Sequence, residues 1–159
     1  SDQETKDKSF IGNIGIYLFI LYYIVLPISY RYSILGHFNH QLQFISTILL
    51  FKGYAMIFLV FKQNSYASPI IRNQKERNHI IITTGLYAYV RHPMYTGFVL
   101  ILIFSPLMLN SLLGLILGIY MSYIFCKRIN IEEDFLMKEF AEYKNYKNKV
   151  KYKILPFVY

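Results

Sequence analysis

The sequence predicts an all-α fold: a polytopic membrane helical bundle of about four transmembrane helices, with a C-terminal helical hairpin and a cytoplasmic C-terminal helix. Composition is the first reason, because hydrophobic residues make up 55 % of the 159 residues and charged residues only 16 %. That balance is too apolar for an ordinary soluble domain of this size. The second reason is that the apolar residues fall in long runs rather than in an amphipathic pattern. Tyr (16) and Phe (13) are abundant, and Tyr suits membrane interfaces because its ring is apolar and its hydroxyl can be hydrated.

The N-terminal third contains two predicted spans. The first runs from Phe10 to Tyr30, carries no charge, and has Pro27 near its end, where a proline is expected to kink or stop the helix. The second runs from Leu42 to Phe61 and has Lys52 near its middle. A lysine there costs roughly 2.5–3.5 kcal/mol, so Lys52 must snorkel, face the bundle interior or touch a polar ligand. Residues 1–9 are polar and predict a disordered tail, and the span that follows lacks the small-residue cleavage site of a signal peptide.

The apolar region from Thr96 to Phe125 predicts a helical hairpin. It is too long for one ordinary span, and Ser105-Pro106 and Asn110-Ser111 interrupt it. We predict one helix from Pro93 to about Leu109, a turn at Asn110-Ser111, and a second helix from Leu112 outward. Pro93 suits the first turn of a helix, where its missing N–H is not needed.

The basic residues predict the topology. Most charges in the connection from Lys62 to Tyr95 are positive, and the tail after the hairpin is rich in lysine. A hairpin returns the chain to the side from which it came, so both basic segments lie in the cytoplasm, as the positive-inside tendency prefers. The net charge of +8 is therefore better explained by loops near anionic lipid than by nucleic-acid binding. The single cysteine, Cys126, excludes a disulfide framework and a cysteine-based metal site within one chain.

The C-terminal tail, from Ile129 to Tyr159, is predicted to begin with a helix. Ile131, Phe135 and Phe140 have helical spacing, and Leu155-Pro156 is expected to end the helix.

The hairpin brings two polar clusters to one place. One cluster, Arg91 to Tyr95, lies just before its first helix, and the other, Arg128 with Glu132 and Glu133, lies just after its second. Arg128 and Glu132 share a helical face because they are four residues apart, and they can face His92 and Tyr95. Together they predict a polar pocket at the membrane boundary. The residues alone do not name a reaction there.

At these positions the sequence resembles the isoprenylcysteine carboxyl methyltransferase family, which is related to phospholipid N-methyltransferases. The resemblance rests on the pattern TxGxYxxxRHPxYxG, a hairpin-length gap, RxxxEE, and the tail segments EYKNYKNKV and ILPFVY, and it covers Asn64 to Tyr159. One departure is Leu86, where many relatives have proline. Together with the predicted tail and spans, the resemblance divides the chain into residues 1–9 (disordered tail), 10–62 (two spans) and 63–159 (methyltransferase core).

The resemblance implies a membrane enzyme that binds S-adenosyl-L-methionine without a Rossmann domain and methylates a lipidic acceptor, such as the carboxylate of a prenylcysteine. It implies that Arg128 contacts this acceptor as the catalytic and substrate-binding arginine. No metal is implied. The implied cofactor contacts are Arg72, His79, Ile80, Ile81, Ile82, Tyr87, His92, Pro93, Met94, Tyr95 and Glu132.

Three alternatives remain open from the sequence. An amine or phospholipid N-methyltransferase would need a base, for which Glu133 or His92 is a candidate. An NADPH-dependent membrane sterol or enone reductase is a more distant enzyme alternative. A non-enzymatic membrane scaffold is the third.

Overall fold

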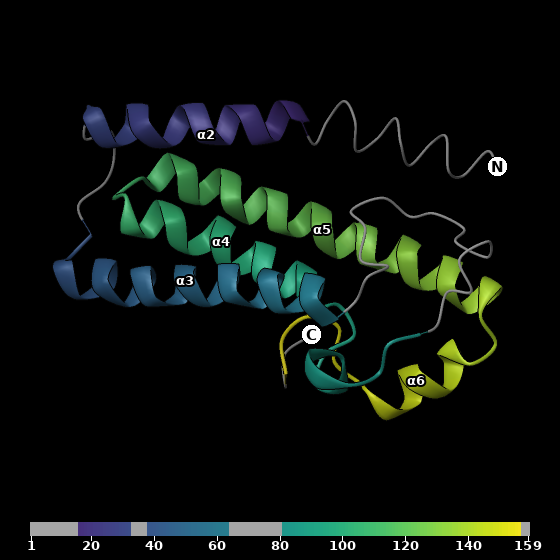
Figure 1. Ribbon diagram of the computed structural model, residues 1–159. Helices are drawn as coiled ribbons and strands as arrows, with labels where there is room; N and C mark the ends of the chain where they lie inside the picture. The colour runs from purple at the N-terminus through teal and green to yellow at the C-terminus, as the bar shows by residue number, and fades with distance from the viewer. Residues whose placement is uncertain (1–15, 33–37, 64–80, 157–159) are drawn as a thin grey trace.

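The computed structural model describes residues 16–32, 38–63 and 81–156. These residues form helices and no strand, which confirms the predicted all-α class. The predicted tail, residues 1–9, lies outside them. Helices α2 (Ile16–Arg31), α3 (His40–Gln63), α4 (Pro93–Met108) and α5 (Leu112–Glu139) lie side by side, and the short helix α6 (Tyr143–Lys149) sits beyond one end of the bundle (Figure 1).

The hairpin of α4 and α5 is the centre of the bundle. Helix α3 packs on α4, and α2 packs on α5, so both hairpin helices have a neighbour on the outer side (Figure 1). The turn falls where the sequence predicted it. Asn110 takes a left-handed conformation (φ 58°), which asparagine tolerates better than most residues, and Ser111 caps α5 by accepting a hydrogen bond from the backbone N–H of Gly114 at 3.0 Å.

Close approach of α4 and α5 depends on a small residue. A Cβ atom on Gly118 of α5 would collide with the backbone carbonyl of Leu102 on α4. Gly53 of α3 and Gly97 of α4 form a second such contact, since a Cβ on either one would lie 2.9 Å from the carbonyl oxygen of the other. Small residues at helix contacts are typical of bundles that pack within a membrane.

The two prolines within helices do not end them. Helix α2 continues past Pro27 to Arg31, and α4 continues past Pro106 to Met108. Pro106 has no N–H to donate to Leu102 four residues earlier. The hydroxyl of Tyr22 on α2 donates to the Leu102 carbonyl instead, at 2.9 Å. A side chain from a neighbouring helix therefore supplies the hydrogen-bond donor that the Leu102 carbonyl lacks because of the proline.

The C-terminal region differs from its prediction in two ways. Helix α5 runs unbroken for 28 residues to Glu139, so Ile131 and Phe135 belong to the hairpin helix and not to a separate tail helix. The predicted helix end near Leu155 is also wrong, because α6 ends at Lys149. Beyond α6 the chain is not helical: the backbone of Val150 is extended, and bends follow from Lys153. Val150 and Ile154 are buried, and the carbonyl oxygens from Val150 to Lys153 accept hydrogen bonds from Arg91 and His92.

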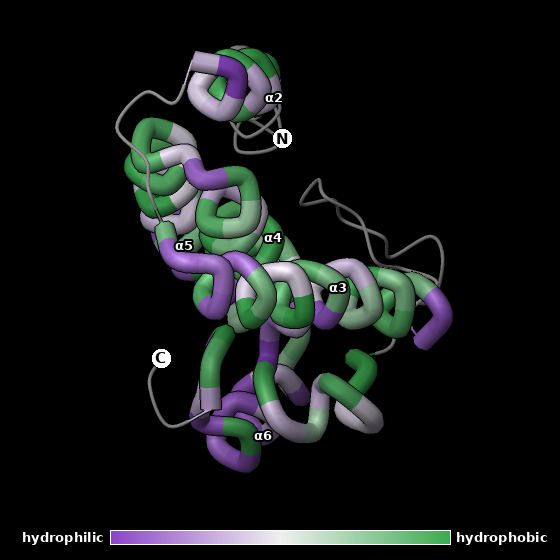
Figure 2. The backbone as a smooth tube through the Cα atoms, turned by 90° about the vertical axis from the view of Figure 1, so that its left-hand side faces the viewer, coloured by the Kyte–Doolittle hydropathy of each residue, from purple (hydrophilic) through white to green (hydrophobic). Residues whose placement is uncertain are grey.

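Apolar side chains cover the outer sides of the bundle. Phe51 and Phe58 of α3 are each 68 % exposed, and Figure 2 colours most of α4 hydrophobic and most of α6 hydrophilic. Lys52 is exposed on the same helix, which excludes the bundle interior among its three predicted environments and leaves snorkelling or contact with a polar ligand. By length and composition α3 and α5 could each cross a membrane, while the apolar segments Leu18–Arg31 and Pro93–Met108 are shorter.

Candidate functional site

The loop before α4 begins with a tight turn. Gly85 has φ +59°, a conformation that glycine adopts without strain, and the short 3-10 helix η3 (Gly85–Ala88) follows. Leu86 donates its backbone N–H to the side-chain oxygen of Gln63 at 3.3 Å. A proline, which many relatives have at this position, could not donate this bond. The turn forms with leucine in place.

Arg91 ties three segments of the chain together. Its Nε donates to Glu133 Oε1 at 2.6 Å, and its Nη1 donates to the carbonyl oxygens of Val150 at 2.6 Å and Lys151 at 2.7 Å. The backbone N–H groups of Arg91 and His92 donate to the next two carbonyls of the same tail, those of Tyr152 and Lys153. The side chains of Arg91 and Glu133 are 3 % and 2 % exposed. This buried pair therefore fixes the loop, the end of α5 and the tail relative to one another.

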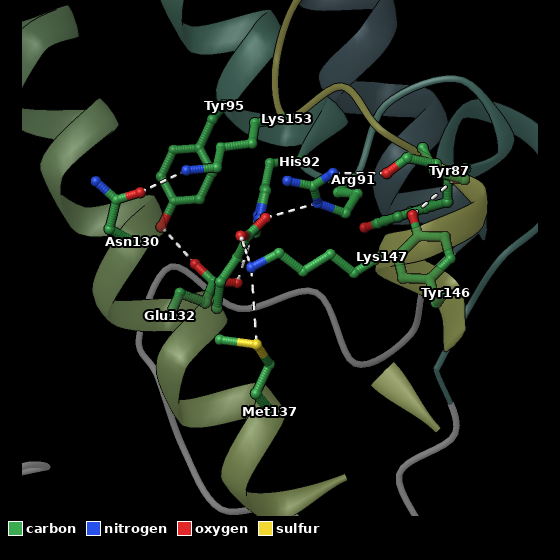
Figure 3. Close-up of polar contacts among 12 residues, drawn as sticks. Tyr87, Arg91, His92, Tyr95, Asn130, Glu132, Met137, Tyr146, Lys147 and Lys153 are labelled. Atoms are coloured by element: carbon green, nitrogen blue, oxygen red, sulfur yellow. Dashed lines mark hydrogen bonds and ion pairs between the residues drawn. The ribbon is translucent and has the colours of Figure 1, made fainter. Parts of the chain in front are cut away.

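The structure brings together the residues of the predicted polar pocket. The hydroxyl of Tyr95 accepts a hydrogen bond from Arg128 Nε at 2.6 Å and donates one to Glu132 Oε2 at 2.9 Å. The His92 ring lies beside the same residues, with Nδ1 3.9 Å from Glu132 Oε1 and Nε2 3.2 Å from Glu133 Oε1. Figure 3 shows His92 and Tyr95 approaching Glu132 from the start of α4. The hairpin thus joins residues more than thirty positions apart.

Burial differs within this group in a way that bears on ligand binding. Arg128, His92 and Tyr95 are each 4–6 % exposed, whereas the Glu132 side chain is 27 % exposed. Of the two neighbouring carboxylates, Glu132 and Glu133, only Glu132 is exposed enough for a ligand to reach. Glu133 is enclosed by Arg91 and His92, and its Oε2 lies 3.2 Å from Lys147 Nζ.

The other predicted contacts divide into three groups. Pro93 opens α4, and Pro93 and Met94 are buried beside His92. Ile81 and Tyr87 pack against Tyr143 and Tyr146 of α6, on the tail side of the site, and Ile82 lies next to Ile81, partly buried. Arg72, His79 and Ile80 lie outside the described residues, so their predicted roles stay predictions.

The sequence did not predict the parts played by Arg91, Glu133 and α6. Arg91 and Glu133 were placed in the two polar clusters, and Glu133 was considered as a base, but their ion pair, which joins residues 42 positions apart, was not predicted. The hydroxyl of Tyr146 donates to the Tyr87 carbonyl at 2.7 Å, so α6 closes the loop side of the site. Burial raises the pKa of Tyr146, which therefore stays protonated and can act as this donor. The tail motif EYKNYKNKV was the signal that could have pointed to α6.

A comparison with models of protein families finds a match. The model of the "Isoprenylcysteine carboxyl methyltransferase (ICMT) family" matches residues 45–138, more than half of the chain. The chain belongs to this family. The match starts within α3, earlier than the motifs that begin at Asn64, and it contains His92, Tyr95, Arg128 and Glu132.

Individual relatives carry the same family name. Protein-S-isoprenylcysteine O-methyltransferase of Saccharomyces cerevisiae is 41 % identical over 85 residues, which cover 52 % of this chain and 36 % of the relative. The human protein of that name is 33 % identical over 93 residues, covering 57 % of this chain and 33 % of the relative. The chain spans about a third of the length of these relatives.

A solved structure shares the fold. The structure titled as the eukaryotic intramembrane Ras methyltransferase aligns with 95 % of this chain and 56 % of its own, with a TM-score of 0.71 and 23 % identity. The family assignment, together with the two long apolar helices, makes the chain an integral membrane protein.

Proposed function

We propose that the chain is an S-adenosylmethionine-dependent methyltransferase that acts within the membrane on a lipidic acceptor, the carboxylate of a prenylcysteine-like molecule. The observation that carries this proposal is the hydrogen-bonded series from Arg128 through Tyr95 to Glu132 at the open end of the hairpin. It offers an anchor for a carboxylate and an anchor for an ammonium group on adjacent side chains.

The residues fit the chemical groups of S-adenosylmethionine. Its amino-acid end carries an ammonium group, which the partly exposed Glu132 can accept. Its sulfonium centre is attracted to aromatic faces, and the Tyr95 ring lies 5.8 Å from the His92 ring and 5.5 Å from the Phe125 ring, centroid to centroid. Tyr95 therefore has both an apolar face and a hydroxyl that holds Glu132 in place.

Methyl transfer needs little from the protein beyond alignment. Bound S-adenosylmethionine would supply a methyl group on a positively charged sulfur, which is already a good leaving group. The chain's residues hold donor and acceptor in line, and such positioning contributes up to about 7–11 kcal/mol. Arg128 orients the acceptor carboxylate, and its own orientation is fixed by its hydrogen bond to Tyr95.

The nature of the acceptor follows from the state of the two candidate bases, His92 and Glu133. His92 is buried, and its Nε2 lies 3.2 Å from Glu133 Oε1. A carboxylate is ionised at neutral pH and needs no base, whereas an ammonium acceptor must first lose a proton. Glu133 is a poor base because it is 2 % exposed and engaged with Arg91, His92 and Lys147. This favours O-methylation over phospholipid N-methylation, and the names of the matched relatives point the same way. Nothing in the described residues favours a reductase or a scaffold.

The proposed topology has four spans with both ends and the active site in the cytoplasm. The basic residues of α6 and the tail, close to the site, support this orientation. The acceptor's prenyl chain would enter laterally from the lipid. Accessibility tags on the loop containing Arg72 and on the C-terminus should both be reached from the cytoplasm, and tags on opposite faces would contradict the topology.

An acceptor comparison tests the proposed reaction. Purified protein in detergent or vesicles is given labelled S-adenosylmethionine with a farnesylcysteine analogue in one sample and phosphatidylethanolamine in another. We expect a base-labile methyl ester on the farnesylcysteine and no labelled phospholipid. Label in the phospholipid alone would overturn the choice of a carboxylate acceptor, and NADPH-dependent chemistry without methylation would overturn the methyltransferase.

A further inference from the structure

Tyr143 and Tyr146 face the same cluster from α6 but differ in their hydrogen bonding. The Tyr146 hydroxyl donates to the Tyr87 carbonyl at 2.7 Å. The Tyr143 hydroxyl is buried, in a side chain only 3 % exposed, and has no hydrogen-bond partner among the residues that the structure describes. Buried hydroxyls without a partner are rare because their desolvation is costly. A partner supplied by a ligand would explain this one.

The surroundings of Tyr143 indicate what kind of ligand would fit. Partly buried Ile81, Tyr87 and Leu136 pack against Tyr143 and Tyr146, whose rings meet edge to face at 5.8 Å. A flat ligand with apolar faces suits such a cluster. Burial and the nearby charge of Glu133 raise the pKa of Tyr143, so its hydroxyl is protonated and acts as a donor. The matching ligand is an aromatic ring with a nitrogen acceptor at its edge.

We propose that the Tyr143 hydroxyl donates a hydrogen bond to the purine ring of the methyl donor, bound among Ile81, Tyr87 and Leu136. This assignment rests on the proposed function and adds a direction to the bound molecule. The adenosine end lies against α6, and the amino-acid end lies at Glu132 on α5. Tyr143 is then a binding residue, separate from the residues that hold the sulfonium and the acceptor.

Two ligands that differ at one end separate these roles. S-adenosylhomocysteine has both the adenosine and the amino-acid end, whereas 5′-methylthioadenosine has only the adenosine. Tyr143→Phe should raise the Kd of both ligands about fivefold to tenfold, the usual effect of one lost hydrogen bond. Glu132→Gln should raise the Kd of S-adenosylhomocysteine and leave that of methylthioadenosine unchanged.

The thermal stability of the ligand-free protein distinguishes a binding role from a structural one. Tyr143→Phe should leave the Tm of the ligand-free protein unchanged or raise it, because no internal bond is lost. Tyr146→Phe, the matched control from the same helix, should lower that Tm because it breaks the bond to Tyr87. Tyr89→Phe, at a side chain 71 % exposed, should change neither Kd nor Tm.

Three results would overturn the assignment. They are unchanged Kd values in Tyr143→Phe, a loss of affinity for S-adenosylhomocysteine alone, and a lower Tm of the ligand-free Tyr143→Phe protein. Failure of the proposed function would look different, because the unsubstituted protein would then bind neither ligand.

Discussion

The two ends of the α4–α5 hairpin are built on different physical principles. At the turn, apolar side chains from α2, α4 and α5 pack around Tyr22, and contacts between helices are set by glycines and by one freed carbonyl. At the open end, Arg91 and Glu133 are buried together, and hydrogen bonds join residues 33–60 positions apart. The turn end is stabilised by apolar packing, by close helix contacts at glycines and by the Tyr22 hydrogen bond. The open end is stabilised by pairs of charged residues that are far apart in the sequence. The residues proposed to bind the methyl donor and the acceptor lie at this end.

The largest effect is expected at the site itself. Arg128→Ala and Glu132→Ala should each abolish methyl transfer, a loss of at least about 100-fold, because each removes a charge-assisted contact to a substrate. Both variants should remain folded, since the Arg91–Glu133 pair that ties the segments together is untouched. Initial rates with a farnesylcysteine analogue, together with size-exclusion profiles, measure the two properties.

Lys127→Ala is the matched control for this loss. Lys127 precedes Arg128 on α5 but is exposed and lies over the Tyr123 ring, 5.4 Å from its centroid. Its removal should leave the rate within about twofold of normal. Full activity in Arg128→Ala or Glu132→Ala would disprove the site assignment.

A smaller effect, on stability, is expected where the open end is tied together. Arg91→Gln leaves Glu133 buried without its closest cation and removes the bonds to the tail carbonyls. Breaking a buried pair in this way costs about 3–5 kcal/mol. Thermal unfolding in detergent should show a lower Tm, and limited proteolysis should cut the tail first.

The exposed neighbour Lys151 provides the comparison for Arg91. Lys151→Ala keeps the backbone carbonyl that Arg91 uses and removes only an exposed side chain. Its unfolding should match that of the unsubstituted protein. An equal loss of stability in both variants would show that the ion pair does not hold the tail.

The smallest effect is expected at the turn end. Tyr22→Phe removes the hydroxyl that donates to the Leu102 carbonyl, at a cost of about 1 kcal/mol. Pro106→Ala restores an N–H that can donate to the same carbonyl within α4. The cost of Tyr22→Phe should therefore be smaller in a Pro106→Ala background. Identical costs in both backgrounds, measured as a double-mutant cycle, would mean that the freed carbonyl is not what Tyr22 stabilises.

The sequence predicted the turn end of the hairpin more fully than the open end. The signals at the turn are local: Asn110-Ser111 break the apolar run, and both observed helices begin where the sequence placed them. At the open end the sequence indicated that His92, Tyr95, Arg128 and Glu132 would meet, because a hairpin places the start of its first helix beside the later part of its second. It did not indicate that Glu133 would pair with Arg91 or that the chain beyond Lys149 would not be helical. Those contacts depend on packing between segments distant in sequence, which carries no periodic signal.

The central claim is that the loop before α4 and the end of α5 form one binding site for the methyl donor. Ultraviolet cross-linking of S-adenosylmethionine labelled in its methyl group, followed by peptide mapping, tests it most directly. The label should appear in peptides that contain Tyr87–Tyr95 or Arg128–Tyr143, and excess S-adenosylhomocysteine should remove it. Label confined to α2 or to the outer side of α3, or label that the competitor does not remove, would contradict the claim.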